Sequence, residues 1–274
     1  MPSTDLESHF KFGENWQSFA RGVDESRIND AIEGLSRLIS PDEIFGKHFF
    51  DIGCGSGLSM LAALRMGASS VNGIDIDPKS VQAAQALLSK HAAGRSWSVE
   101  VRSVFELGRG KEQNYDIVHS WGVLHHTGDM WEAIDRATGL VAVGGTLVIA
   151  IYRKKLLCSA WRLEKRFYAR SPSWIQAIIR GAYKTLFFIR LLLSGRSPWD
   201  HMRSYHDRGM SWHHDVHDWL GGFPYESAHP AQVEEFLSHR GFSLAHRGAR
   251  NPYRLGIFGT ACDEFVAHRT VRAG

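Results

Sequence analysis

One short stretch constrains this chain most, because an apolar strand pattern runs directly into a glycine-rich turn and then into a helical pattern. The predicted strand Phe49–Ile52 carries Asp51 near its end, and the turn that follows, Gly53–Gly57, has glycine at alternate positions. Alternating glycines let the backbone turn sharply and approach a ligand closely. The helix expected from Leu58 directs its free N–H groups into the turn. The pattern predicts a ligand site at a strand end in an α/β sheet.

The second strand ends in another acid, and its position indicates the kind of ligand. Asp75 closes the strand predicted over Val71–Ile74, where a carboxylate can accept hydrogen bonds from both hydroxyls of a ribose. The dinucleotide fingerprint needs a third glycine where this chain has Leu58. Asp51 would repel a pyrophosphate and suits a cationic ligand. A nucleoside ligand with a cationic end fits these residues better than a dinucleotide, so an NAD-linked oxidoreductase is disfavoured.

Four ordered motifs resemble those of the class I S-adenosylmethionine-dependent methyltransferases. They are the turn motif 51–57, the second strand and its end at 73–78, the strand and loop 115–126, and the glycine-entered strand 144–150. The resemblance covers residues 45–152 and, more weakly, the C-terminal end. A tryptophan–glycine–glycine–proline–tyrosine–glutamate stretch near residue 220 is similar to ubiquinone-type small-molecule O-methyltransferases.

The resemblance implies the Rossmann-like methyltransferase fold, a doubly wound, mostly parallel seven-stranded sheet with N-terminal helices and a helical lid insertion. Alternation of strand and helix patterns independently favours a parallel sheet. We expect cap helices in 1–44, an S-adenosylmethionine-binding core in 45–152, a helical lid in 153–229, and a C-terminal helix with a β-hairpin in 230–274. The late strands would form an antiparallel hairpin that closes the sheet.

The expected elements follow apolar periodicity and turn signals. The predicted strands are Phe49–Ile52, Val71–Ile74, Ser98–Val101, Tyr115–His119, Thr146–Ile151, Ser243–His246 and Gly256–Cys262. The predicted core helices are Leu58–Met66, Ser80–His91, Met130–Leu140 and Pro230–Arg240. Phe12 and Trp16, in the N-terminal helices, are candidates to cover the cleft, although plain core packing is favoured for Trp16.

The resemblance also implies which residues hold the cofactor, S-adenosylmethionine. The glycine turn would hold the methionine part, Asp75 the ribose, and Ile76 and Val104 the two faces of the adenine. Ser103 or Glu106 would lie near the adenine amino group, and residues 119–121 would flank the sulfonium. The candidate cofactor-binding residues are Asp51, Gly53, Cys54, Gly55, Gly57, Asp75, Ile76, Ser103, Val104, His119 and Trp121.

Methyl transfer to a hydroxyl needs a base, because the acceptor proton must leave as the methyl group arrives. Histidine is the natural base near neutral pH. The candidate catalytic residues are His126, His214, Asp215 and Asp218. A purely structural role is the alternative for each. His213 and His217 would share a helix face and could ligate a metal, but without a further clear ligand no metal is predicted.

The first part of the lid, residues 153–196, carries eleven Lys and Arg residues against the single acid Glu164, interleaved with aromatic and aliphatic residues. Two or three basic amphipathic helices are expected there. Their apolar faces would pack on the core or on a second copy of the chain, as in a homodimer. Alternatively, the segment forms a peripheral membrane contact or a surface for an anionic substrate. Nucleic acid ranks third and is not expected as a partner.

Bulk properties set further bounds. A chain of 274 residues with 43% hydrophobic residues can bury a full core, and a net charge of +3 is too small to indicate nucleic-acid binding. Three widely separated cysteines show no metal spacing. The polar, acidic start is unlike a signal peptide, and no apolar run is long enough to span a membrane. A cytoplasmic location is expected.

These observations together predict an S-adenosylmethionine-dependent methyltransferase. Its acceptor would be a small hydroxylated molecule, a sugar or a phenol- or quinone-like compound, either free or carried on a lipid, with histidine as the base. N-methylation of an amine or a modified nucleotide is the alternative reaction. A module that binds S-adenosylmethionine without turnover is the alternative from a different class.

Overall fold

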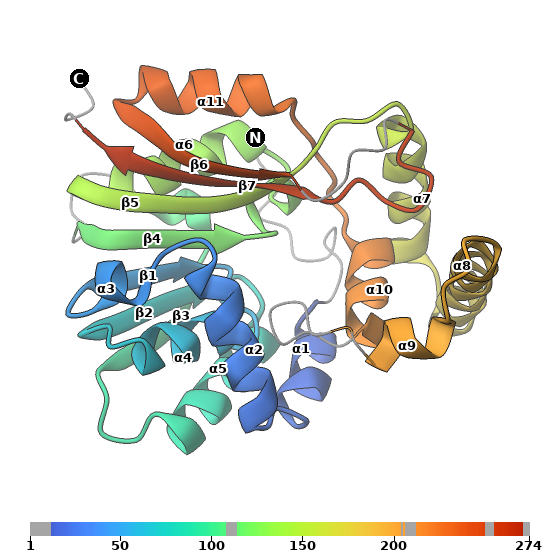
Figure 1. The fold of residues 1–274 in the computed structure, drawn as a ribbon, viewed down its shortest axis with the longest axis horizontal. Helices are drawn as coiled ribbons and strands as arrows, with labels where there is room; N and C mark the ends of the chain where they lie inside the picture. The colour runs from blue at the N-terminus through green and yellow to red at the C-terminus, as the bar shows by residue number, and fades with distance from the viewer. Residues whose placement is uncertain (1–11, 108–113, 204, 206–211, 250–254, 271–274) are drawn as a thin grey trace.

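The computed structural model describes residues 12–107, 114–203, 205, 212–249 and 255–270. Seven strands of this part form one sheet (Figure 1): β1 (His48–Ile52), β2 (Ser70–Asp75), β3 (Trp97–Val101), β4 (Tyr115–Trp121), β5 (Val141–Tyr152), β6 (Phe242–Ala249) and β7 (Cys262–Arg269). The order is β3-β2-β1-β4-β5-β7-β6, with β1 to β5 parallel and β7 antiparallel to both neighbours. The direction of winding changes between β1 and β4, where doubly wound sheets bind ligands. The predicted fold class is confirmed.

Helices cover both faces of the sheet. They are α1 (Phe12–Ala20), α2 (Glu25–Ser36), α3 (Pro41–Ile44), α4 (Leu58–Arg65), α5 (Pro78–His91), α6 (Met130–Leu140), α7 (Cys158–Arg170), α8 (Ser173–Leu193), α9 (Pro198–Arg203), α10 (Trp212–Gly221) and α11 (Pro230–His239). Two short 3₁₀ helices, Val104–Glu106 and Leu124–His126, follow β3 and β4.

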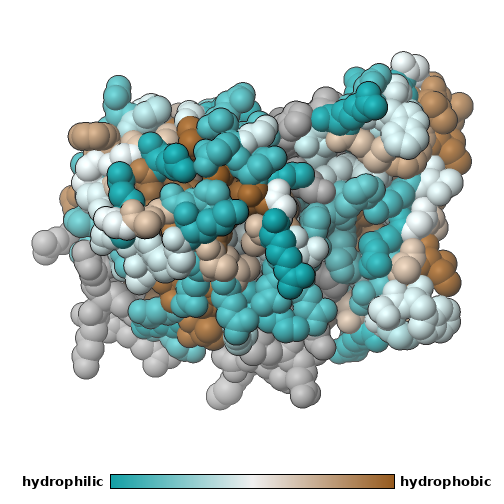
Figure 2. All heavy atoms as spheres, turned by 90° about the horizontal axis from the view of Figure 1, so that it is seen from below, coloured by the Kyte–Doolittle hydropathy of each residue, from teal (hydrophilic) through white to brown (hydrophobic). Residues whose placement is uncertain are grey.

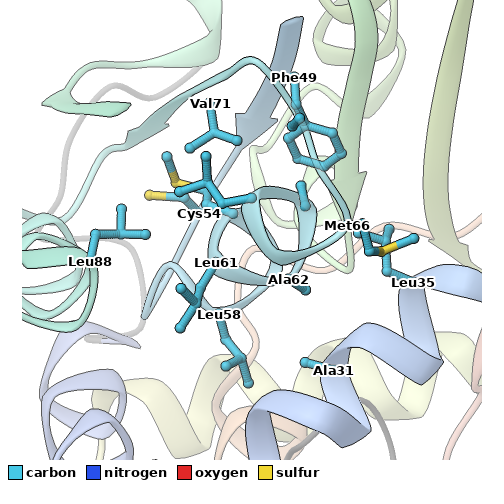
Figure 3. Packing of buried hydrophobic residues seen from close by; sticks show 14 of the residues in the cluster. Ala31, Leu35, Phe49, Cys54, Leu58, Leu61, Ala62, Met66, Val71 and Leu88 are labelled. Carbon is cyan, nitrogen blue, oxygen red and sulfur yellow. The ribbon is translucent and has the colours of Figure 1, made fainter. Parts of the chain in front are cut away.

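Alternation of side chains along the strands builds two separate hydrophobic layers. Phe49 and Val148 pack with α2, α4 and α5 on one face, while the neighbouring Phe50 and Leu147 pack with α6 and α11 on the other. Figure 3 shows the first layer, in which α4 lies between the strands and α2. Because helices cover both faces of the sheet, the strand sequences are continuously apolar, as is usual for parallel sheets.

Helices α7 to α10 form a separate group beyond the carboxyl ends of the strands (Figure 1). Their own small core contains Tyr168, Trp212, Val216 and Leu220, which are all buried. In Figure 1, α10 lies nearest the sheet and α8 lies outermost.

The strand predicted over Gly256–Cys262 is wrong, because the last strand begins where that prediction ends. Gly256 and Gly259 have φ of +69° and +113°, and Ala261 has φ of +54°. A left-handed backbone at these positions is incompatible with a strand. The fifth strand also begins earlier than expected. Its two glycines, 144 and 145, produce an irregularity in the pairing with β4 instead of a preceding turn.

Candidate active site

A single large cavity of about 830 Å³ lies at the carboxyl ends of the strands. Its lining comes from the β1–α4 turn, the ends of β2 and β4, α1, and the inner side of the α8–α10 group. A cleft at this edge of the sheet is where doubly wound folds bind ligands. The glycine turn therefore opens into the same space as residues from the distant helical segment.

The glycine turn is held open by left-handed backbone geometry. Gly53 and Gly55 have φ of +72° and +53°, values that side-chain-bearing residues rarely adopt. A Cβ on Gly53 would lie 2.4 Å from Cγ1 of Val123, and a Cβ on Gly55 would lie 2.9 Å from the Trp16 ring. Both glycines are required by geometry and by space.

Asp75 ties the glycine turn to the second strand. Its carboxylate accepts the backbone N–H of Gly55 at 3.0 Å and that of Asp77 at 2.9 Å. Burial raises the pKa of Asp75 to about 6, against the lowering effect of these two donors. The carboxylates of Asp77 and Asp51 raise it further. A half-buried acid of this kind at a cleft indicates a functional site, because a ligand that donates hydrogen bonds would favour its ionised form.

A second acid of the site is paired with a histidine. The Asp51 carboxylate lies 2.7 Å from Nδ1 of His119, and both side chains are about 5% exposed or less. The two residues occupy adjacent strands, β1 and β4, in register. The pair therefore forms a rigid wall of the cavity next to the glycine turn.

Helix α1 forms a roof over this half of the cavity. Phe12 and Trp16 both line it. The backbone N–H of Gly13 donates to Asp77 at 2.9 Å, and Lys79 forms a 2.7 Å ion pair with Glu14. Trp16 packs against the hydrophobic core, as favoured, and its ring also lies against the glycine turn.

The cavity brings together all of the predicted cofactor residues except Gly57. Gly57 instead caps α4 with φ of +77°, and a Cβ there would lie 2.9 Å from Cβ of Ala84. Its role is to allow close packing of α4 on α5. The motifs did not single out Arg102 or Phe105, which also line this half. Both residues are close in sequence to Ser103, a predicted cofactor residue, and this closeness could have indicated that they line the site.

The other half of the cavity is rich in aromatic side chains from segments far apart in the sequence. They are Tyr152, Tyr183, Phe187, Tyr205, Trp212, Trp219 and Phe258. Sequence reasoning did not assign any of them to the site, because aromatic residues at helical spacing look the same whether they face a core or a cavity. This half offers flat, apolar walls to a ligand.

His126 lies where the two halves meet. Its Nδ1 lies 2.7 Å from the backbone carbonyl oxygen of Pro224. A carbonyl only accepts, so Nδ1 carries the proton, and in the neutral ring Nε2 is the basic nitrogen. Its ring contacts the rings of Phe12 and Tyr152. The neighbouring His125 is fully buried, and burial lowers its pKa well below the usual value, which suits a structural residue.

Asp215 and Asp218 also line the cavity, from α10. The hydroxyl of Tyr205 donates to Asp215. Asp218 accepts from the Asn15 side-chain amide at 2.8 Å, and burial raises the pKa of Asp218 well above its usual value. Asn15 also donates to the backbone carbonyl of His214 at 3.1 Å. The roof helix is thereby bonded directly to the helix that carries both acids.

The structure separates His214 from the other candidate catalytic residues. His214 does not line the cavity; its ring packs against Phe19, with Nε2 3.4 Å from the Ser18 hydroxyl. Burial lowers its pKa, with positive charge nearby adding to the effect. Residues 206–211, which precede α10, lie outside the described residues.

His213 and His217 share a face of α10 as expected, but that face packs on α8. Lys184 lies 2.9 Å from Nδ1 of His213, and Arg180 lies 3.2 Å from Nδ1 of His217. Within the part of the chain that the structure describes, no group of three or more His, Cys, Asp or Glu side chains could hold a metal ion.

The central part of the chain matches a known family of protein domains. Residues 50–147 match the model of a methyltransferase domain. The matched segment, which is similar to methyltransferase domains, contains the glycine turn, Asp75 and the loop after β4. The match supports the predicted enzyme class, a methyltransferase that uses S-adenosylmethionine.

Curated relatives match over a similar region. A ribosomal protein L11 methyltransferase of Laribacter hongkongensis is 31% identical over 119 residues, which are 42% of this chain and 38% of that protein. A ubiquinone biosynthesis O-methyltransferase of Sinorhizobium fredii is 31% identical over 122 residues, 44% of this chain and 47% of that protein. The chain thus spans less than half the length of these relatives, which differ in the acceptors they are named for.

Similarity of fold extends further. The structure of magnesium protoporphyrin IX methyltransferase from Synechocystis covers 93% of this chain with a TM-score of 0.56 at 18% sequence identity. At that identity the likeness supports the fold alone.

The residues of the cavity fit S-adenosylmethionine. Asp75 is half-buried, and each of its oxygens accepts one backbone N–H, so lone pairs remain for two ribose hydroxyls. The turn needs glycine where a ligand must approach the backbone, and Asp51 places negative charge beside it. The assignment of individual residues to parts of the cofactor stays a prediction.

Proposed function

We propose that this protein transfers a methyl group from S-adenosylmethionine to a hydroxyl group of a small ring-containing acceptor. The observation that carries the proposal is the shared cavity, which joins the glycine turn to His126 and to an aromatic chamber. A base and a cofactor site that open into one cavity can act on the same bound acceptor.

The acceptor class is proposed from the lining of the second half. Aromatic rings from β5, α8 and α10 favour a flat, largely apolar acceptor over a sugar. Two of the similar proteins are named for ring-containing molecules, ubiquinone and magnesium protoporphyrin IX. A ribosomal protein L11 methyltransferase is also similar, but the aromatic lining of the cavity favours a small flat molecule.

S-adenosylmethionine supplies the methyl group, and the chain positions the acceptor and takes up its proton. The bond from Nδ1 to the Pro224 carbonyl fixes the ring of His126 and leaves Nε2 as the proton acceptor. Asp215 and Asp218 line the acceptor half. Because burial raises the pKa of Asp218, this carboxyl can remain protonated and donate a hydrogen bond to the acceptor. In this scheme His126 is the base, and His214 helps to hold α10 against α1.

The test compares His126→Gln with His214→Gln in a labelled-methyl assay that uses catechol and hydroquinone as probes. Loss of an aligned base lowers kcat by roughly 10²–10⁴-fold, so His126→Gln should show that loss while its affinity for S-adenosylmethionine stays unchanged. His214→Gln should retain most activity. The opposite ranking would contradict the assignment and restore His214 as the base.

N-methylation of an amine is a second candidate, favoured by one observation. The acceptor half combines aromatic rings with the carboxyl group of Asp215, a setting that attracts organic cations. Phenethylamine as a third probe distinguishes the two reactions. A protein that binds S-adenosylmethionine but methylates neither these probes nor a small-molecule extract would be a binding module.

A further inference from the structure

The outer surface of the helical group is unusually apolar. Of the seventeen large apolar side chains that are exposed among the described residues, eleven lie between residues 156 and 199. On α8 they follow helical spacing along one face: Trp174, Ile178, Leu186, Ile189 and Leu193, from 46% to 85% exposed. Figure 2 shows brown, hydrophobic side chains gathered along the right edge of the molecule, the side on which α8 lies in Figure 1.

The same helix is apolar on its opposite side, where it meets the protein. Tyr183 and Phe187 line the cavity, and Phe188 stacks on Trp212 of α10 with ring centroids 5.0 Å apart. Packing on α10 therefore already accounts for one apolar face of α8. The outer face of Ile178, Leu186 and Ile189 has no such role within the part of the chain that is described. An apolar face of this length is a docking surface.

The segment that carries this face also carries exposed positive charge. Lys154, Arg166, Arg170 and Arg196 are exposed, and between residues 153 and 196 the sequence has Glu164 as its one acid. Glu164 is half-buried, and burial raises its pKa to about 7, so it is only partly ionised at neutral pH. A helical segment with exposed apolar side chains and exposed cations matches the boundary between the acyl chains and headgroups of an anionic membrane.

We propose that the outer face of α7 and α8 binds an anionic membrane surface, with α8 lying in the plane of the interface. Trp174, near one end of α8, and Trp199, just beyond the other, are 64% and 70% exposed, as expected for interfacial anchors. None of the helices in the described part has the length and apolar character needed to cross a bilayer, so the contact is peripheral. The cavity-lining side of α8 would then face the acceptor half, one helix away from the lipid.

A second copy of the chain is the rival occupant, and charge disfavours it. In a symmetric dimer the same patch faces itself, so the exposed basic side chains of α7 would approach their own equivalents. Like charges in an interface core are unfavourable, whereas an anionic lipid surface neutralises them.

The experiment measures co-sedimentation of the whole protein with sucrose-loaded vesicles. One set contains phosphatidylcholine alone, and the other contains phosphatidylcholine with phosphatidylglycerol. Two variants probe the surface, Ile178→Ser/Leu186→Ser/Ile189→Ser for the apolar face and Arg166→Ser/Arg170→Ser for the cations. The matched controls are Val143→Ser, an exposed apolar residue elsewhere, and Lys47→Ser/Lys90→Ser, with the same change in charge.

Wild-type protein should bind the anionic vesicles, and binding should fall with added salt. The apolar variant should lose at least about tenfold in affinity, since each buried methylene contributes to interfacial binding. Loss of two arginines should weaken binding by roughly 30-fold, from about fivefold per cation. Both controls should bind like wild type. All variants should retain affinity for S-adenosylmethionine, which shows that they are folded.

Two results would overturn the proposal. If wild-type protein ignores both vesicle types and sediments as a dimer that the apolar substitutions dissociate, the face is an interface between copies. If binding to neutral and anionic vesicles is equal and insensitive to salt, the surface does not recognise anionic lipid.

Discussion

Cofactor affinity should depend on pH through Asp75, and this dependence can be worked out from the structure. The carboxyl is half-buried at the end of β2, and burial raises its pKa to about 6, well above the usual range of an aspartate. Ribose hydroxyls donate hydrogen bonds and therefore prefer the ionised carboxylate. Binding should strengthen as the pH rises through 6 and weaken as it falls below 6.

The size of the effect follows from the fraction of Asp75 that is ionised. With a pKa of about 6, nearly all of it is ionised at pH 7.5 but only about one-tenth at pH 5. If the ionised form alone binds well, Kd should rise about tenfold between these two pH values. Asp75→Asn keeps an oxygen acceptor but cannot titrate. Its affinity should be lower throughout, by about 1.5–3 kcal/mol for each charge-assisted bond that is weakened, and flat with pH.

Stability should change in the opposite sense. The pKa of Asp75 is higher in the folded state than in the unfolded chain, so its ionisation favours unfolding. The contribution of protonated Asp75 to the free energy of unfolding is fully present below pH 4. It is lost as the pH rises from about 4 to about 6, a difference of about 3 kcal/mol. Asp75→Asn should therefore unfold at higher urea concentration than wild type at pH 7.5 while binding the cofactor less tightly.

Isothermal titration calorimetry with S-adenosylhomocysteine between pH 5 and 8 measures the first effect. Subtracting the pH dependence of the binding free energy of Asp75→Asn from that of wild type removes the contributions of titrating groups on the ligand and on other residues. An equal pH dependence in both proteins would refute the reasoning, because the titrating group would then lie elsewhere.

Three further outcomes follow from packing, hydrogen bonding and burial. Gly57→Ala should destabilise the fold by about 2–4 kcal/mol in urea unfolding, because the left-handed backbone and the contact with Ala84 both resist a Cβ. Asn15→Ala should cost about 1–3 kcal/mol in the same assay and lower the affinity for the cofactor, because it removes the bond to Asp218 and unties α1 from α10. Burial raises the pKa of the Cys54 thiol well above its usual value, so iodoacetamide should label Cys54 only after denaturation; rapid labelling of the native protein would show that the turn opens.

The central strands could be predicted because short local sequence patterns determine where they begin and end. Acids at strand ends, glycines at forced turns and apolar runs located β1, β2 and β4 to within two residues. The predicted Gly256–Cys262 strand failed because three residues in that stretch adopt left-handed backbone, and two of these are glycines that read as ordinary breaks in a strand pattern.

The acceptor half could be predicted only in part. His126, Asp215 and Asp218 were found because they carry polar chemistry, and all three line the cavity. His214 was a candidate beside Asp215, yet Asp215 lines the cavity whereas the ring of His214 packs against Phe19 of α1. One residue along a helix turns a side chain by about 100°, so adjacency in sequence separates two groups in space.

The roof formed by α1 has a consequence for the order of events in a catalytic cycle. Through Gly13 and Glu14 it is bonded to the cofactor half, and through Asn15 it is bonded to α10 of the acceptor half. Any movement of α1 that admits one ligand must also loosen the pocket of the other. The spent cofactor and the product would then leave together. With both substrates saturating, this release step, and not the proposed methyl transfer itself, would limit the turnover rate.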